Sequence, residues 1–172
     1  MTCTRLSPLG AVLRGLLAAA AGTLAMDLLW YARYKRGGGE SGFADWELSA
    51  GLDDWEHASA PGKLGKHLYE GFLQREMPAR YAALTNNVMH WGYGIGWGAL
   101  YGIVAGSECR PRARFGLLLG PIVWASGYVV LPLAKLYKPI WQYDPKTLWD
   151  DLSAHLVYGL ATAAVFRWLA AR

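Results

Sequence analysis

Four stretches of the chain are nearly free of charged residues, and each is long enough to cross a lipid bilayer. They predict transmembrane helices at about residues 9–33, 84–106, 114–134 and 147–170. A helix needs roughly 20 mainly apolar residues to span the hydrocarbon core. An even number of spans returns the chain to the side of the membrane on which it started. The pattern predicts an all-α, polytopic membrane protein with one membrane domain, residues 1–172.

The first apolar stretch also resembles a secretory signal peptide, because Arg5 and Arg14 are followed by the small-residue run GLLAAAAG. Apolar character resumes after Asp27 through the residues LLWYA. The whole stretch then has the length of a span rather than of a leader. We therefore expect a retained first helix.

A polar loop, residues 34–81, separates the first two predicted spans. Its first half, GESGFADWELSAGLDDWEHAS (39–59), carries six carboxylates and neither Lys nor Arg. Such a block is usually a solvated surface, and the alternative is a vestibule that attracts cations. In the second half, Leu64, Leu68 and Phe72 recur every four residues after a helix-starting proline. This spacing predicts an amphipathic helix at the membrane interface.

Composition agrees with a membrane location, since apolar residues make up 53% and aromatic residues 13% of the chain. Aromatic residues cluster near the predicted helix ends on the side of the long loop, as in an interfacial belt. The side with both termini carries seven Lys/Arg and one acid, whereas the other side carries ten Lys/Arg and eleven acids. This charge density predicts termini in the cytoplasm and a place in the plasma (inner) membrane, while the Lys and Arg near the helix ends are nearly balanced between the two sides. No basic helix points to a nucleic-acid partner. The expected partner is the lipid bilayer.

The second span opens with TNNVMHWGYG, residues 85–94, which places amides and an imidazole inside a membrane segment. Polar groups at that depth are costly and usually have a role. A four-residue series then continues along the helix through Asn86, His90, Gly94, Gly98, Gly102 and Gly106. Overlapping GxxxG steps allow another helix to approach closely. We therefore expect a packing seam, and association with further copies or other membrane subunits.

The last span repeats the spacing with Asp151, His155 and Gly159, the last of which we also expect at a helix contact. His90 and His155 lie about two turns inside the loop-side boundary, and Asp27 lies at a similar depth in the first span. The sequence thus predicts one buried polar cluster made of Asp27, Asn86, Asn87, His90, Asp151 and His155. The cluster either locks the helices together or lines a site for a solute, a proton or a cofactor.

Other chemistry has little support in the sequence. Cys3 and Cys109 form no CxxC pair, and neither an HExxH motif nor a phosphate-binding glycine loop is present. No catalytic residue is predicted and no cofactor is expected. The favoured function is a non-enzymatic transport, sensing or accessory component. The alternative is a redox or metal-binding membrane protein in which His90 and His155 ligate haem or a metal ion, and a membrane enzyme ranks last.

Several short motifs in the second half of the chain resemble the YagU-like family of bacterial inner-membrane proteins. They are the run Asn87-Val88-Met89-His90-Trp91, the pairs Pro132-Leu133 and Lys138-Pro139, and the run His155-Leu156-Val157. The family pattern places a histidine at the position of Asn87 and an asparagine at that of His90. The resemblance therefore implies a role for His155 more than for His90. It implies a small polytopic membrane protein and brings no established reaction.

Overall fold

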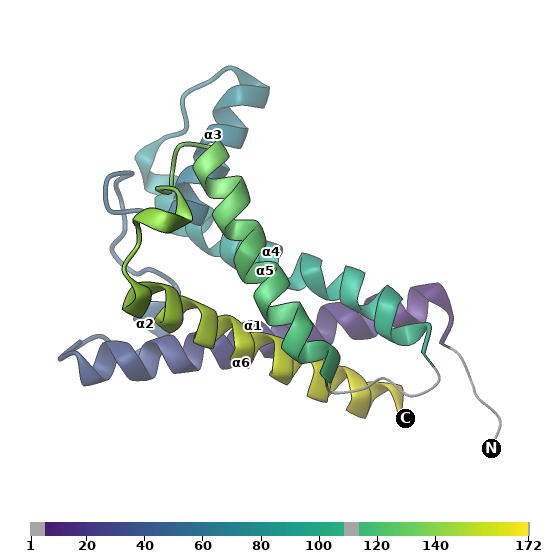
Figure 1. Ribbon diagram of the computed structural model, residues 1–172. Coiled ribbons are helices and arrows are strands. Elements are labelled where there is room, and N and C mark those ends of the chain that lie inside the picture. Colours follow the sequence, from purple (N-terminus) through teal and green to yellow (C-terminus); the bar gives the residue numbers. More distant parts are fainter. Residues whose placement is uncertain (1–5, 109–113, 172) are drawn as a thin grey trace.

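The computed structural model describes residues 6–108 and 114–171, and this part of the chain is helical without any strand. Cys3, Cys109 and most of the ECRPRAR turn lie outside the described residues. The elements are α1 (Pro8–Arg36), α2 (Phe43–Glu47), α3 (Ala60–Leu73), the 3₁₀ turn η1 (Ala79–Tyr81), α4 (Ala82–Gly106), α5 (Arg114–Leu133), the 3₁₀ turn η2 (Ile140–Gln142) and α6 (Pro145–Ala170) (Figure 1).

Two of the long helices, α1 and α6, begin at a residue whose side chain caps the helix. Ser7 accepts a hydrogen bond from the backbone N–H of Gly10 at the start of α1, at 3.1 Å. Asp144 accepts one from the N–H of Thr147, at 2.9 Å, with proline in the first turn of α6. Asp144 and Pro145 therefore form a capped helix start, in which proline occupies a position that needs no amide donor.

Three described helices, α1, α5 and α6, are long and apolar enough to cross a membrane. These helices are compatible with a membrane protein. Helix α4 has 25 residues and contains no Asp, Glu, Lys or Arg, but its mean hydropathy falls below that of these three helices. The physical reason is that Asn86, Asn87, His90 and its glycines replace aliphatic side chains.

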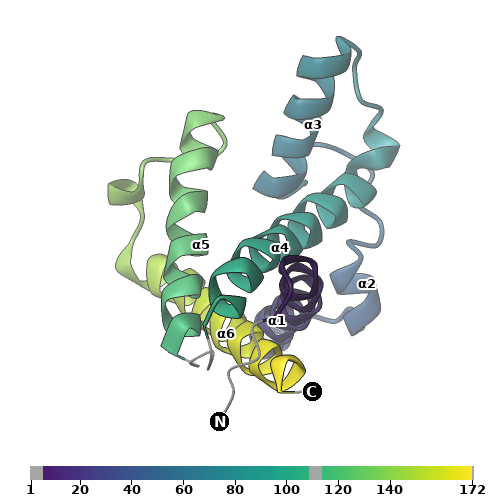
Figure 2. The same cartoon turned by 90° about the vertical axis from the view of Figure 1, so that its right-hand side faces the viewer.

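Helix α1 lies at the centre of the fold, between α4 on one side and α6 on the other. Helix α5 packs on the far side of α6, so the helices follow the spatial order α4, α1, α6, α5. Helices α4 and α5 hardly touch and diverge toward the end of the molecule that carries α3 (Figure 2). The divergence opens a space above α1 and α6.

Glycines allow the backbones of α1 and α4 to approach closely. A Cβ atom added to Gly98 would lie 2.4 Å from the carbonyl oxygen of Gly15, and one added to Gly102 would lie 2.3 Å from that of Ala11. Gly94 and Gly106 are also buried against α1. The seam predicted in the second span is thus filled by the first helix of the same chain.

The second close approach joins α5 to α6. A Cβ atom on Gly159 would lie 2.2 Å from the carbonyl oxygen of Gly116 and 2.6 Å from the amide nitrogen of Gly120. Between α1 and α6, Gly22 lies against Thr162 and Tyr158. Small residues therefore occur at each of the three main helix contacts, where they let the backbones approach closely.

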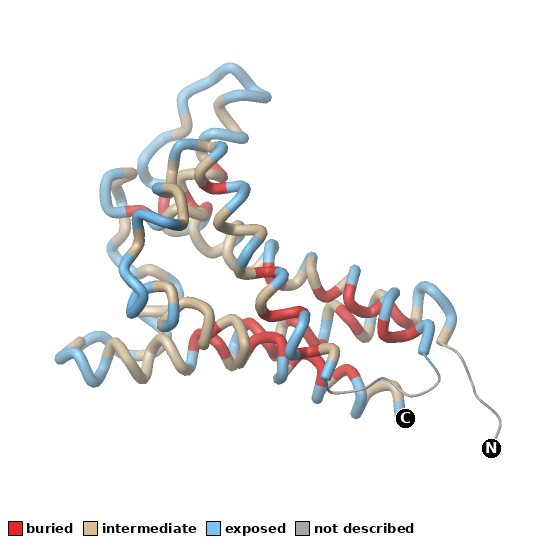
Figure 3. The backbone as a smooth tube through the Cα atoms, viewed as in Figure 1, coloured by how far each residue is buried: buried red, intermediate tan, exposed pale blue. Residues whose placement is uncertain are grey.

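Buried residues concentrate at the end of the helices near the chain termini, while the loop end is more exposed (Figure 3). Tyr158 and Phe166 of α6 are the largest fully buried side chains of the described residues, and the ring of Phe166 meets that of Tyr101 edge-on. This packed region holds the helices together. The candidate site lies beyond it, where the helices separate.

Candidate functional site

A cavity of about 510 Å³ lies between the diverging helices α4 and α5. Its floor comes from α1 and α6, and residues from the loop between α1 and α3 also line it. The phenol of Tyr158 closes its deep end, because it donates a 2.7 Å hydrogen bond from α6 to the carbonyl oxygen of Gly94 in α4. The volume is in the range of sites that bind small molecules.

The first polar contact at the cavity joins α1 to α4. His90 Nε2 lies 2.9 Å from Asp27 Oδ1 and 3.1 Å from Asp27 Oδ2. Asp27 is only 3% exposed, whereas the imidazole is partly open to the cavity. A buried carboxylate needs such a partner, because an unpaired charge away from water is costly.

Glu47, which belongs to the long loop, lies beside the contact between Asp27 and His90. Its carboxylate accepts a 2.8 Å hydrogen bond from the indole N–H of Trp91, and it interacts with the carboxyl group of Asp27. Burial raises the pKa of Glu47, and the neighbouring charge of Asp27 raises it further. Two acidic groups and one imidazole therefore share one wall of the cavity.

An aromatic cluster holds α2, and thus Glu47, against the end of α1. The ring of Tyr31 lies 5.2 Å from that of Phe43 and 5.5 Å from that of Trp46, and Tyr34 lies 6.1 Å from Trp46. Such ring pairs stabilise the contact beyond the apolar area that they bury. The carboxylate of Glu47 is therefore positioned by the fold rather than free in a loop.

The two asparagines of α4 bind the loop that covers the cavity. Asn86 donates to Ser49 Oγ at 2.9 Å and accepts from the hydroxyl of Ser59. Asn87 donates to the carbonyl oxygen of Leu48 at 3.0 Å. These contacts explain the amides at the head of the predicted span: they tie the loop after α2 to α4.

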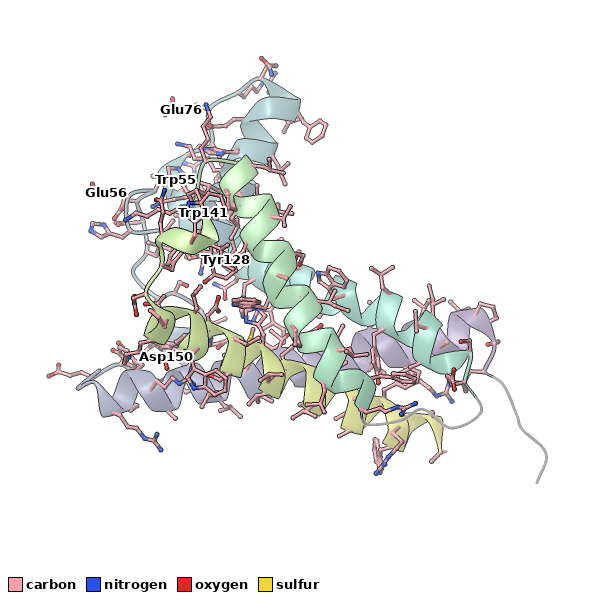
Figure 4. All side chains as sticks on the ribbon, viewed as in Figure 1. Trp55, Glu56, Glu76, Tyr128, Trp141 and Asp150 are labelled. Atoms are coloured by element: carbon pink, nitrogen blue, oxygen red, sulfur yellow. The ribbon has the colours of Figure 1, made fainter. Side chains whose placement is uncertain are left out.

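The opposite wall belongs to α5 and α6. His155 Nδ1 lies 2.9 Å from the backbone carbonyl oxygen of Asp151 and 3.3 Å from its carboxylate, so His155 is oriented by its own helix. The carboxylate of Asp151 in turn interacts with the hydroxyl of Tyr128. In Figure 4 Tyr128 lies between α5 and the start of α6. Histidine and carboxylate thus pair on this wall as they do on the other.

Three tyrosines pack around that carboxylate. The ring of Tyr128 lies 5.5 Å from those of Tyr137 and Tyr143, which come from the segment between α5 and α6. Burial raises the pKa of Tyr137 to about 12, and the charge of Asp151 contributes to the shift. A smaller hollow of about 380 Å³ shares Tyr128 and Tyr137 with the main cavity and extends to Thr147, near the loop end of α6.

The lining of the main cavity has an unbalanced charge. It contains the three carboxylates of Asp27, Glu47 and Asp151 and no Lys or Arg among the described residues. The nearby Arg33 lies outside the lining, where it covers the ring of Trp30 at 4.9 Å and donates to the backbone oxygen of Asp150.

The structure places all six residues of the predicted polar cluster along this one cavity: Asp27, Asn86, Asn87, His90, Asp151 and His155. The two histidines face different aspartates. In the part of the chain that the structure describes, no three His, Cys, Asp or Glu side chains are placed to hold a metal ion.

Sequence reasoning missed the part that Glu47 plays. Of the six carboxylates in the acidic block, only Glu47 is among the residues that line the cavity. A signal was present in Phe43 and Trp46, which lie three residues apart on the short helix and whose rings pack against Tyr31 and Tyr34 of α1. Their pairing across the loop is a tertiary contact, which spacing alone does not show.

No family model matches the chain, and no curated protein or solved structure matches it either. The resemblance to the YagU-like family therefore stays a prediction, and the function must be argued from the cavity itself.

Proposed function

We propose that the protein is a small four-span membrane protein that binds a solute in the cavity between α4 and α5, as a transport or sensing component without catalytic activity. The observation that carries the proposal is the grouping of Asp27, Glu47, His90, Asp151 and His155 around a single cavity. Ionisable groups inside a membrane usually mark a solute or proton pathway.

Helix α4 is the fourth span of this proposal. It packs along α1, and 25 residues correspond to a length of about 37 Å, enough to cross the hydrocarbon core. The polar groups that lower its hydropathy face Asp27 and the covering loop, so they are partnered inside the protein. Lipid would then meet side chains such as Leu100, Ile103 and Val104, all of which are exposed.

Helix α3 is proposed to lie in the membrane interface. Its Gly62 and Gly65 contact α4 at Asn86, Thr85 and Met89, while the opposite end leaves Phe72 84% exposed. Leu68 and Leu73 are exposed as well. Apolar side chains at that end of an interfacial helix would insert among lipid headgroups.

The proposed location is the inner membrane of a bacterium, with both termini in the cytoplasm and the cavity near the opposite face. Family membership with YagU-like proteins belongs to the same proposal. Association with another copy or another membrane subunit would use the exposed apolar faces of α4 and α5, because α1 already fills the glycine seam.

Water access to the cavity tests the proposal. Gly127 of α5 lines the cavity, and an added Cβ atom there meets no other atom within 4 Å. In a chain with Cys3→Ser and Cys109→Ser, we expect Gly127→Cys to react with a membrane-impermeant thiol reagent from the loop side. Gly96→Cys is the matched control, because its position on α4 is equally open but lies outside the cavity lining.

A thiol in lipid reacts slowly with a polar reagent, since the reactive thiolate is disfavoured there. Labelling of Gly127→Cys well above that of Gly96→Cys supports the proposal. Equal, slow labelling of both variants in native membranes would contradict it, because the cavity would then be closed to solutes.

A further inference from the structure

The charge and the rings of the cavity define the kind of solute that it fits. We infer that the cavity binds a monovalent organic cation that carries aromatic or apolar groups, a statement that rests on the proposed solute site and names its substrate class. Three observations support this assignment: an excess of carboxylates, a lining rich in aromatic rings, and carboxylates that do not converge on one point.

The excess of carboxylates is independent of the state of the histidines. Asp27, Glu47 and Asp151 line the cavity together with two imidazoles, and the described lining holds no Lys or Arg. Even with both imidazoles protonated, three negative charges face two positive charges. With the imidazoles neutral, the excess is larger. The cavity therefore carries net negative charge whenever its carboxylates are ionised, and it attracts cations.

The rings favour an organic cation. Trp30, Trp46, Trp124 and Tyr128 line the cavity on different sides, from α1, α2 and α5. A cation near the face of an aromatic ring is attracted by the ring quadrupole, and tryptophan is the strongest partner. The same rings accept the apolar groups of the solute, since aromatic side chains dominate sites of this size.

The separation of the carboxylates argues against a small metal ion as the occupant. Asp27 and Glu47 lie on the wall formed by α1 and α2, while Asp151 lies on α6 among the tyrosines. A hard cation such as Ca²⁺ needs about six to eight oxygen ligands around one point. A large cation with delocalised charge has no such need. It interacts with both walls at longer range.

Each wall has its own part in this scheme. Glu47 and Asp27 provide the main negative potential, and the covering loop that Asn86 and Asn87 hold keeps them out of bulk water. Asp151 and the tyrosines lie toward the smaller hollow that reaches the loop end of α6. A cation entering from the loop side would meet Asp151 before Asp27.

The test uses two ions of the same shape and opposite charge, tetraphenylphosphonium and tetraphenylborate, with the full-length protein in detergent. Isothermal titration calorimetry against protein-free micelles measures the binding of each. We expect saturable binding of tetraphenylphosphonium and none of tetraphenylborate. Glu47→Gln and Asp27→Asn, which keep shape and hydrogen bonding, should each weaken cation binding by about tenfold or more. Asp45→Asn is the matched control, because Asp45 lies in the same short helix but outside the lining.

Several results would overturn the inference. Equal binding of both ions would show partition by apolar contact alone, and unchanged binding in both carboxylate variants would remove the charges from the site. Displacement of the phosphonium by millimolar Na⁺ would make the site one for inorganic cations. If no binding occurs although Gly127→Cys is labelled, the substrate class is wrong and the solute site stands. If Gly127→Cys is also unlabelled, both proposals fail.

Discussion

His90 Nε2 lies 2.9 Å from Asp27 Oδ1, although the two residues are 63 positions apart in the sequence. The contact joins α1 to α4. The carboxylate is buried, while the imidazole borders the cavity. The pair therefore has two effects: it compensates a charge inside the fold, and it places that charge beside the cavity.

Removal of the imidazole should destabilise the protein through the aspartate that it leaves behind. We expect His90→Ala to lower the free energy of unfolding by about 3 kcal/mol, because Asp27 then stays buried without its imidazole partner. Thermal unfolding in detergent measures the loss. Adding Asp27→Asn to His90→Ala should restore much of it, since an amide tolerates burial better than a carboxylate. A double variant no more stable than His90→Ala would show that the loss has another origin.

The contact between α1 and α4 should be intolerant of a single methyl group. A Cβ atom on Gly98 would lie 2.3 Å from the Cβ atom of Ala19, whereas one on Gly96 meets no atom within 4 Å. We expect Gly98→Ala to destabilise the fold by about 3 kcal/mol or more, because two backbones must separate. Gly96→Ala, two residues away on the same helix, is the control and should be neutral or slightly stabilising. Equal melting temperatures for the two variants would contradict the packing.

Glu47 should make stability depend on pH. Its folded-state pKa lies above the ordinary value of 4.5, because the group is buried and faces Asp27, with His90 and Trp91 as its other neighbours. Between the ordinary and the raised pKa, the folded state binds more protons than the unfolded state, so stability falls as pH rises. Relative to Glu47→Gln, the unmodified protein should lose stability as pH rises above 4.5, until the folded-state pKa has been passed. If the curves of melting temperature against pH were parallel for the unmodified protein and Glu47→Gln, this role of Glu47 would be refuted.

The proposed four-span topology predicts opposite accessibility for two serines. Ser41 lies in the long loop after α1, and Ser107 follows the last residue of α4. In the cysteine-free background, Ser41→Cys and Ser107→Cys should react with an impermeant reagent from different sides of the membrane. Labelling of Ser41→Cys alone in intact cells fits termini in the cytoplasm, and labelling of Ser107→Cys alone would reverse the orientation. Labelling of both from one side would contradict the four-span arrangement.

The haem alternative is tested by the absorption spectrum of the purified protein. A haem protein of this kind would show a strong Soret band that either His90→Ala or His155→Ala abolishes or shifts. We expect the purified protein to have no such band, because each imidazole is engaged by its own aspartate on a separate wall. A Soret band sensitive to both substitutions would favour the redox alternative over the solute site.

The sequence predicted the helical class, since this depends on local period and length. Asp27, His90 and His155 line one cavity because residues equally far from the boundary meet when spans pack side by side. The start of α6 followed from Asp144 and Pro145 for an equally local reason.

Only the tertiary structure shows which helices pack against one another. The glycine series in α4 indicated a close contact but did not say whether the partner was another copy or α1, because any small-residue face satisfies the pattern. Nor did it indicate the divergence of α4 from α5, which depends on how Tyr158 and the loop segments fill the space. The role of Glu47 depends on rings from two separate elements and was missed for the same reason.

The central position of α1 has a consequence for biosynthesis. This helix is synthesised before both of the helices that cover it, α4 and α6. In the proposed four-span arrangement, the carboxyl group of Asp27 lacks its imidazole partner until α4 is inserted, and the small-residue face of α1 has no helix against it. The nascent first helix should therefore remain beside the insertion machinery, or bind a membrane chaperone there, until residue 90 has entered the membrane.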